Sequence, residues 1–421
     1  MSRDYKPRPE ITELYEYMVK IRRHCHINAE TAFNEFDTAA YITKELKSMK
    51  GMQVINNIGG PTGVVGILRG KTERPCIGLR ADIDALPLTE DPTGKVYAST
   101  RKGAMHACGH DTHIAMLLAA ARVASEKWNS KMHGSIKFIF QPAEENGGGA
   151  KRMIEDGLLD VGGFDIDAFY GIHISSFAPV GMVFANVGTT MAGGDFFYIT
   201  VNGVGGHGSA PHQTKDAIVI ASHLITALQT VVSRNVDPQK GSVLSVGKIE
   251  AGSVANAIAS TASMEGTVRF FEPEVKVLLR NRLTEICKGV AATFGVEIDI
   301  RYVDIFPALT NDKGPTELVR SIVSKITPHL GPAFKATGSE DFSRFLELRP
   351  GCFFNVGGKI NDGKMRPHHS PLFDINEEAM LVGASCWVQL IEDMLVTQVI
   401  KDVAGGERRG VTKPAAAAVR L

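Results

Sequence analysis

The chain has 421 residues, and its 46 basic residues balance 46 acidic ones, so the formal net charge is zero. This neutral total and the lack of an uncharged stretch as long as a membrane span predict neither a nucleic-acid nor a membrane partner. The N-terminal segment lacks the apolar core of a secretory signal, and six cysteines are too few for a disulfide scaffold, which favours a cytoplasmic location. The length exceeds that of one typical core and predicts two domains, or one domain with a large insertion.

The first part of the chain alternates between helical and strand-like patterns. Helical apolar spacing covers residues 11–27 and 38–49. The short apolar runs GVVGIL, CIGLRAD and SIKFIFQP are typical of strands buried on both faces, and a helix at about 112–127 separates the last two. This alternation predicts a mostly parallel α/β sheet.

The pattern changes after about residue 186. It then predicts a strand (FFYITVNG), a helix (DAIVIASHLITALQTVV), two strands (SVLSVGKI and ASMEGTVRFF), a helix (VKVLLRNRLTEICKGVAATF) and a strand (VEIDIRYV). That βαββαβ order is the ferredoxin-like split unit. We therefore expect a larger α/β domain from residues 11–185 and 307–400, with residues 186–306 inserted as a small α+β domain. Residues 401–421 mix Gly, Pro, Ala and charge with little apolar period and are expected to be a flexible tail.

The segment MHACGHDTH combines residue types that bind metals. Thiolate and imidazole donate to borderline-soft divalent ions. Cys108 and His110 flank Gly109, and at this spacing both donors converge only on a loop, because residues i and i+2 diverge on a helix. A helix is expected just afterwards, with Asp111 or Thr112 as its N-cap, which puts the pair where open α/β sheets bind ligands. For this segment alone, a buried structural cysteine beside scattered histidines is an equally good interpretation.

Two adjacent carboxylates, Glu144 and Glu145, follow the apolar run SIKFIFQP and precede Gly-rich chain. Neighbouring side chains point in different directions, so one can bind a metal while the other faces the water that the metal activates. A divalent metal lowers the pKa of bound water, and a nearby carboxylate can accept the proton. A Glu-Glu pair alone is more often a solvated surface pair, but its place after a buried strand favours a site.

Three further histidines follow. His173 ends an apolar run, and His368 and His369 precede Ser-Pro. Each is weak evidence alone, because a lone histidine is more often satisfied within a core. Together with the Cys-x-His and Glu-Glu segments, they supply the donors that a hydrolytic centre with one or two metals needs.

These segments also carry a family resemblance. The motifs RADIDALP, MHACGHDTH, QPAEE, GIH, GGHGSAPH, GSVANAIASTASMEGTVR, GSEDF and HSPLFD occur in order between about residues 21 and 390. With them the chain resembles the co-catalytic metallopeptidase family that includes aminoacylases, hippurate hydrolases and plant indole-acetyl-amino-acid hydrolases. The resemblance implies a metallopeptidase-like α/β catalytic domain with an inserted α+β, ferredoxin-like domain that serves dimerisation or acts as a lid.

The resemblance also implies a role for each matching position. Glu144 is similar to the general base, and His207 to a histidine that reaches a neighbouring subunit's active site to stabilise an oxyanion, which requires a homodimer through the inserted domain. Asp84 resembles a carboxylate that orients a ligand. Asn256 and Arg269 resemble groups that contact the substrate's carboxylate. The implied metal ligands, with Cys108 as the bridge if two metals bind, are Cys108, His110, Glu145, His173 and His369.

Two departures from the family pattern bear on the substrate. The N-terminal motif His-x-His-Pro-Glu is HINAE here, and a segment that usually ends Gly-Thr-x-Arg-Thr-Phe has Phe270 in place of the second Thr. An aromatic residue beside Arg269 is expected to reshape the substrate pocket.

We therefore expect a metal-dependent amidohydrolase that cleaves the C–N bond of a small N-acyl amino acid or a related amide, aromatic amides included. The alternative is a deaminase that releases ammonia from a small aromatic amine, for which Phe270 is the one hint. A non-catalytic binding protein and a nucleophilic Cys108 fit less well, because they leave the other candidate ligands without a role. One or two divalent ions are expected per subunit, with Mn²⁺ favoured by the resemblance, Zn²⁺ next, and Co²⁺ or Ni²⁺ compatible with the donors.

Overall fold

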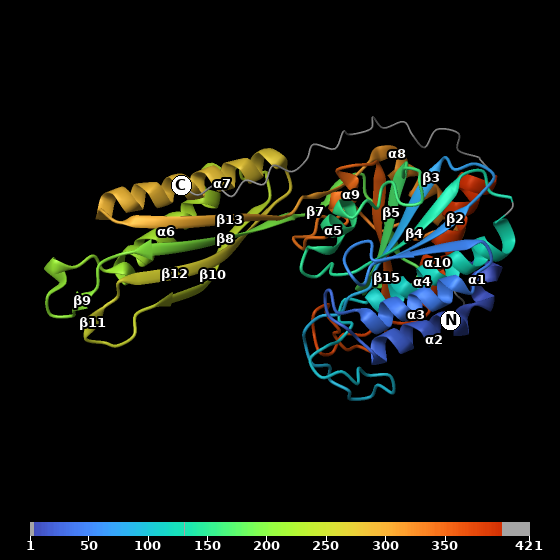
Figure 1. Cartoon of the computed structure of the whole chain (residues 1–421), viewed down its shortest axis with the longest axis horizontal. Helices are drawn as coiled ribbons and strands as arrows, with labels where there is room; N and C mark the ends of the chain where they lie inside the picture. The colour runs from blue at the N-terminus through green and yellow to red at the C-terminus, as the bar shows by residue number, and fades with distance from the viewer. Residues whose placement is uncertain (1–3, 130, 398–421) are drawn as a thin grey trace. The chain divides into compact units, whose positions relative to one another are not determined.

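The computed structural model describes residues 4–129 and 131–397 (Figure 1). The described chain divides into two compact units, called here the large unit and the small unit. The large unit contains residues 4–188, 310–334 and 341–397, and the small unit contains residues 189–309 and 335–340. The expected tail, 401–421, and the last residues of the expected segment 307–400 lie outside the described residues.

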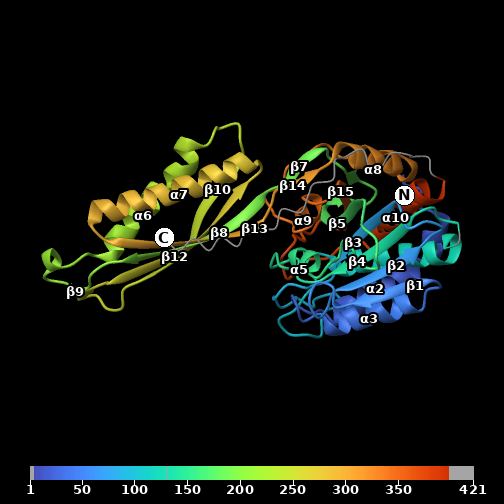
Figure 2. The same cartoon turned by 45° about the horizontal axis from the view of Figure 1, so that its top comes forward.

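A seven-stranded sheet forms the centre of the large unit, in the order β1-β2-β4-β3-β5-β15-β6. Its strands are β1 (Met52–Asn56), β2 (Val64–Arg69), β3 (Cys76–Asp82), β4 (Ser135–Gln141), β5 (Ala168–Pro179), β6 (Val183–Phe184) and β15 (Gly351–Lys359). The central strands β4, β3, β5 and β15 run parallel to one another. This mixed sheet, flanked by helices, is the expected α/β class (Figure 2).

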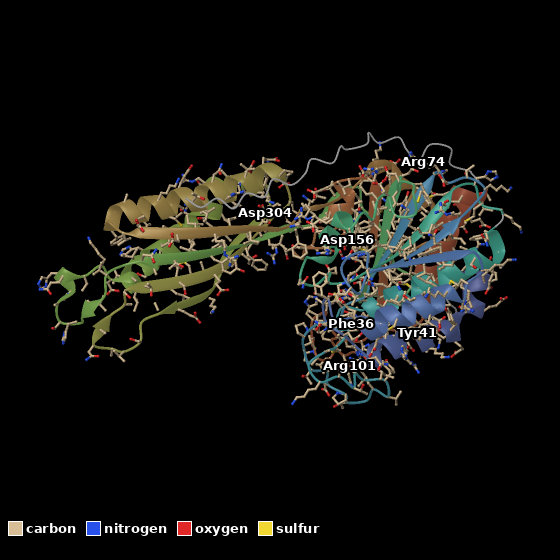
Figure 3. All side chains as sticks on the ribbon, in the orientation of Figure 1. Phe36, Tyr41, Arg74, Arg101, Asp156 and Asp304 are labelled. Carbon is tan, nitrogen blue, oxygen red and sulfur yellow. The ribbon has the colours of Figure 1, made fainter. Side chains whose placement is uncertain are left out.

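The expectation of a mostly parallel sheet is wrong for its edges. The GVVGIL run becomes β2, which pairs antiparallel with both β1 and β4, and β6 pairs antiparallel with β15. β1 ends at Asn56 and β2 begins at Val64, and so short a link fits a hairpin but not a parallel crossover. Asp156 fixes this link by accepting the N–H groups of Gly59 and Gly60 at 3.0 and 2.9 Å (Figure 3).

Helices cover the sheet of the large unit. They are α1 (Pro9–Glu13), α2 (Tyr15–Ile27), α3 (Phe36–Lys47), α4 (His110–Val123), α5 (Gly149–Glu155), α8 (Lys313–Ile326), α9 (Ser343–Leu346) and α10 (Ala379–Ile391). One apolar cluster joins α1–α4, α8 and α10 to one face of the sheet, to which β4 contributes the alternate residues Ile136, Phe138 and Phe140. The helix expected over 11–27 is interrupted at Leu14 and forms α1 and α2.

Among the described residues, two helical stretches are long and apolar enough to cross a membrane by length and composition alone. One is residues 379–396, formed by α10 and the π-helix η3 (Glu392–Val396), and 89% of it is buried in the large unit. The other is α6 (Ala217–Asn235) of the small unit, which buries only one face. Both therefore have the character of packed helices, since core packing and amphipathic packing account for their apolar residues.

The predicted site residues follow the carboxyl ends of neighbouring parallel strands. Asp82, the last residue of β3, pairs with Gln141, the last residue of β4. The chain then continues to Asp84 after β3 and to Glu144 after β4. The register between these two strands therefore sets where the two acidic segments meet.

The helix after the Cys-x-His segment begins earlier than expected. α4 starts at His110, not after an N-cap at Asp111 or Thr112, and Gly109 is its N-cap residue. Gly109 has a φ of +89°, a left-handed conformation that glycine adopts without strain, and a Cβ there would lie 2.3 Å from the Ile174 side chain. This turn leaves Cys108 outside the helix and makes His110 its first residue.

The small unit is a four-stranded antiparallel sheet with two long helices on one face (Figure 1). Its elements follow the predicted βαββαβ order, and the sheet order is β10-β12-β8-β13. They are β8 (Gly193–Asn202), α6, β10 (Ser242–Ala251), β12 (Thr261–Phe270), α7 (Pro273–Phe294) and β13 (Glu297–Phe306). A short pair, β9 (Gly206–His207) and β11 (Ala257–Ile258), extends from the end where β8 finishes and β12 begins.

A buried arginine connects α2 to the first turn of α4 and to the loop before α10. Arg22 is fully buried, and its guanidinium lies 3.0 Å from Asp111, 2.8 Å from Asp374 and 3.0 Å from Glu377. Buried charges are tolerated when they are paired and hydrogen-bonded. Arg22 thus compensates three carboxylates, one of which, Asp111, lies beside His110.

We predict that Arg22→Met destabilises the large unit by about 3–5 kcal/mol, because it leaves buried carboxylates uncompensated. Both tryptophans, Trp128 and Trp387, lie in this unit, so denaturant unfolding followed by tryptophan fluorescence measures its stability. Arg23→Met is the matched control: the Arg23 side chain is 41% exposed and contacts Glu377 alone among these carboxylates, so we expect about 1 kcal/mol or less. Equal losses in the two variants would contradict the prediction.

Candidate metal centre

The structure brings the five predicted metal ligands together in the large unit. The donor atoms of Cys108, His110 and His173 all lie within 4.8 Å of one another, and so do those of Cys108, Glu145 and His369. Cys108 belongs to both groups. The five side chains come from the loop before α4, the start of α4, the turn after β4, strand β5 and the loop before α10.

The spacing of these donors suits a shared cation. Cys108 Sγ lies 3.4 Å from His173 Nε2, and Glu145 Oε1 lies 3.9 Å from His110 Nε2 and 3.4 Å from His369 Nε2. Two donors bound to one ion at about 2.0–2.3 Å lie about 3–4 Å apart. Among the described residues, buried His110 Nε2 and Glu145 Oε1 have no hydrogen-bond partner, which is costly unless an ion binds them. A thiolate, imidazoles and a carboxylate together fit a divalent metal.

Asp84 orients both His110 and the segment that carries Glu145. The Asp84 carbonyl accepts a hydrogen bond from His110 Nδ1 at 2.9 Å. His110 Nε2 is therefore the ring nitrogen whose lone pair can bind a metal. The Asp84 carboxylate accepts the Glu145 backbone N–H at 3.1 Å. Burial opposes charge on His110, but Asp82, Asp84 and Glu145 raise its pKa to about 10. Surrounding carboxylates that favour a proton there also favour a metal cation.

His113 holds the strand that carries His173, and it was not among the predicted site residues. Its Nδ1 donates to Asp82 at 2.5 Å, and its Nε2 accepts the Ile174 backbone N–H at 2.9 Å. Asp82 in turn pairs with Arg80 at 2.7 Å. Burial and neighbouring histidines hold the pKa of His173 well below its usual value, so its ring is neutral, as a metal ligand must be. The spacing of His113 three residues after His110, on one helix face, was the available signal.

A second unpredicted residue, Glu35, supports the backbone before Glu144. Glu35 is fully buried at the start of α3, accepts the Ala143 N–H at 2.9 Å and accepts the Thr62 hydroxyl at 2.6 Å. Ala143 has a φ of +53°, an unfavourable conformation for a residue with a Cβ. The hydrogen bond that Glu35 accepts therefore fixes a strained turn, and this turn sets the position of buried Glu144. The Glu144 carboxylate lies within 4.8 Å of the donor atoms of His110 and Glu145.

The small unit carries His207 and Asn256 side by side. The β9–β11 pairing places His207 opposite Ala257, and the Asn256 carbonyl accepts the Gly208 N–H at 2.8 Å. His207 is exposed. Its Nδ1 accepts a hydrogen bond from the Ser209 N–H at 3.1 Å and lies 2.8 Å from the Ser209 hydroxyl oxygen. These contacts orient the ring and leave Nε2 available.

Arg269 lies at the opposite end of the small unit's sheet from this pair. It occupies the end of β12 paired with Gly194, about 26 Å along the strand from Thr261, where β11 joins. A Cβ on Gly194 would lie 2.7 Å from Ser339 Oγ and 3.0 Å from Arg269 Nη1, so the glycine lets both groups approach. The buried Ser339 hydroxyl has no hydrogen-bond partner among the described residues. Within one chain, therefore, Arg269 lies near Ser339 and far from Asn256.

Phe270, which was expected to reshape the substrate pocket, lies on the opposite face of β12 from Arg269. Successive strand residues point to opposite faces, and Phe270 is only 2% exposed within the apolar cluster beneath α6 and α7. Arg269 instead bonds on the other face to Thr267 Oγ1 and, at 3.0 Å, to the Val268 carbonyl. The departure from the family pattern thus belongs to the core of the small unit.

Comparisons with a family model, with known proteins and with solved structures all indicate the same family. Residues 78–393 match the model of peptidase family M20/M25/M40. The chain is 43% identical over 371 residues to an N-acetyl-L-cysteine deacetylase of Bacillus subtilis, covering 88% of this chain and 86% of that protein. It is 38% identical over 386 residues to a hippurate hydrolase of Campylobacter jejuni, covering 91% and 97% of the two proteins. Its fold matches a dinuclear metal-binding M20 peptidase of Bacillus subtilis with a TM-score of 0.77, at 29% identity and coverage of 90% and 98%.

We predict that Glu35→Leu lowers hydrolytic turnover about 10–100-fold, the usual effect of removing a supporting contact behind a metal site. Glu35→Gln should stay near the parent rate, because its carbonyl can accept the Ala143 N–H and its amide can contact Thr62. Steady-state kinetics and elemental analysis of bound metal measure both effects. Equal turnover in the Leu and Gln variants would remove the proposed support from Glu35.

Proposed function

The chain belongs to peptidase family M20/M25/M40, and on that premise we propose that it hydrolyses the amide bond of small N-acyl amino acids. It is a metal-dependent hydrolase of carbon–nitrogen bonds. Relatives named N-acetyl-L-cysteine deacetylase and hippurate hydrolase support the proposed substrate class, since both names describe N-acyl amino acids.

One observation carries the proposal: Cys108 is shared by two groups of ligand atoms, and Glu144 lies beside them. We assign Cys108, His110, Glu145, His173 and His369 as the residues that would hold one or two divalent metals, with Cys108 common to both groups of donor atoms. Glu144 is left for proton transfer because the neighbouring Glu145 takes the ligand role. This division gives each of the two adjacent carboxylates one chemical task.

The proposed reaction divides the work among this chain's residues. A divalent metal held by these residues would supply polarisation of the scissile carbonyl and would lower the pKa of water. Glu144 accepts the proton of the attacking water and then delivers it to the leaving nitrogen. His207 donates a hydrogen bond to the oxygen that becomes negative during attack. Asp84 keeps His110 and the Glu145 backbone in place throughout.

Arg269 and Ser339 are proposed to bind the substrate's carboxylate. Arginine offers a planar fork that matches a carboxylate, and burial lowers the pKa of Arg269, so its half-buried charge favours an anionic partner. The Ser339 hydroxyl, which has no hydrogen-bond partner in the described part of the chain, supplies one further donor. The deaminase alternative loses its support because Phe270 lies in the core of the small unit.

We propose Mn²⁺ as the metal, with Zn²⁺ next, and Co²⁺ or Ni²⁺ as ions that the same donors accept. The mixed set of thiolate, imidazole and carboxylate supports a borderline ion. We also propose a cytoplasmic location, since all six cysteines are free thiols and Cys108 alone among them is not buried.

We propose that the protein acts as a homodimer formed through the small unit. His207 and Asn256 lie together at one end of that unit, exposed and distant from Arg269. A small substrate cannot reach both ends of the small unit of one chain. The arrangement supports a site to which a second copy contributes His207 and Asn256.

Glu144→Gln should lower turnover of an N-acyl amino acid by about 10²–10⁴-fold, because the amide cannot accept the proton of water. Metal content should stay at the parent level, since Glu145 is kept. Release of free amino acid and of ammonia, measured separately, tests the bond that is cleaved. The control is Glu155→Gln, an exposed residue of α5, which should leave both measurements unchanged.

Near-normal turnover in Glu144→Gln would reject its role as base. Release of ammonia without free amino acid from a panel of N-acyl amino acids and aryl amines would favour deamination and reject the proposed function.

Mixing two inactive variants tests whether the site is shared. In a heterodimer of His207→Ala and Glu144→Gln subunits, one of the two sites combines an intact Glu144 with the other subunit's intact His207. Random exchange should therefore restore about a quarter of the parent activity. Each variant alone should stay inactive, and a mixture as inactive as its components would place His207 in its own subunit's site.

A further inference from the structure

His368 lies beside Cys108 and has been given no role so far. Its ring is mostly buried, and its Nδ1 is 3.6 Å from Cys108 Sγ. Its Nε2 accepts the Ser176 backbone N–H at 3.2 Å. The rings of Phe177, Phe373 and His173 surround it, with centroids 5.8, 4.9 and 5.4 Å away. Both ring nitrogens thus face defined groups, and the packing holds the plane of the ring.

The contact with Ser176 determines where the ring carries its proton. A backbone N–H can only donate, so the Nε2 that faces it must present a lone pair. The imidazole is therefore neutral and carries its single N–H on Nδ1. That N–H faces Cys108 Sγ at a separation suited to a hydrogen bond to sulfur, and the ring also lies within hydrogen-bond reach of the Cys108 backbone.

The backbone at His369 lets two consecutive histidines reach the same centre differently. His369 has a φ of +59°, a left-handed conformation, and its N–H donates to the Ala107 carbonyl at 2.9 Å. Its side chain approaches Glu145, whereas that of His368 approaches Cys108. His369 thus joins the donor group of Cys108 and Glu145, whereas His368 contacts the sulfur at hydrogen-bond distance.

We propose that His368 donates a hydrogen bond from Nδ1 to the Cys108 thiolate and thereby sets how strongly the sulfur binds metal. This rests on the proposed role of Cys108 as a ligand. A donor aimed at sulfur stabilises its negative charge, and the partial burial of this contact strengthens the interaction. His368 is a positioning residue, because it acts on the metal through Cys108.

Two substitutions separate the contacts of the ring. His368→Asn keeps an N–H donor near the Nδ1 position but loses the acceptor for Ser176. His368→Gln keeps an acceptor near the Nε2 position but loses the donor to sulfur. His368→Leu removes both contacts. The metal-free forms of all three are compared by denaturant unfolding with tryptophan fluorescence, so that loss of folding is recognised.

The readouts are the sulfur-to-metal charge-transfer absorption of the Co²⁺-loaded protein and Co²⁺ affinity measured by competition with a chelator. In the Gln and Leu variants the absorption should move to lower energy and the affinity should fall about 10–100-fold, as for other supporting contacts. The Asn variant should resemble the parent in both. The number of bound Co²⁺ ions should be the same in all four proteins.

Other results would overturn the proposal in distinguishable ways. A parental spectrum in Gln with an altered one in Asn would make Ser176 the important contact. If all three variants had the absorption and the Co²⁺ affinity of the parent, His368 would not donate a hydrogen bond to the sulfur. Loss of one bound ion in all three would make His368 itself a ligand. Absence of the charge-transfer band in the parent would overturn this inference together with the proposed role of Cys108.

Discussion

The arrangement of the centre depends on Asp84, which joins the two segments that carry His110 and Glu145. Its carbonyl fixes the imidazole of the first, and its carboxylate fixes the backbone of the second. Asp84 follows β3 by two residues, so the register between β3 and β4 sets its position. Ligands must hold their geometry to within about 0.5 Å, and two paired strands give that precision more readily than free loops.

The charges around Asp84 are balanced so that a cation is still favoured. Behind the ligands, Asp82 pairs with Arg80 and Asp111 pairs with Arg22, so an arginine faces each of these buried carboxylates. Asp84 and Glu145 face His110 instead. Burial opposes charge on His110, but Asp82, Asp84 and Glu145 together raise its pKa.

The sequence predicted best what depends on residue type and local order. The α/β class was confirmed, and the donors in the Cys-x-His and Glu-Glu segments could be selected because few other residues bind metals. The supporting role of Glu35 could not be selected, because it depends on a contact between distant segments: Glu35 accepts the Ala143 N–H across 108 positions. The antiparallel β2, the start of α4 at His110 and the role of His113 left local signals in the short link before β2, in Gly109 and in the spacing of His113 after His110. The partner of His113, Ile174, lies 61 positions away and has no such local signal.

The small unit constrains how the predicted substrate contacts can work together. Arg269 and the pair His207 and Asn256 lie at opposite ends of one sheet, about 26 Å apart along β12. A small acyl amino acid is far shorter than that distance, so no single chain can apply both sets to one molecule through this unit. If both sets act on the substrate, they must come from two copies. Dimer formation would then be a condition for catalysis, and a monomer would hold metal without a complete site.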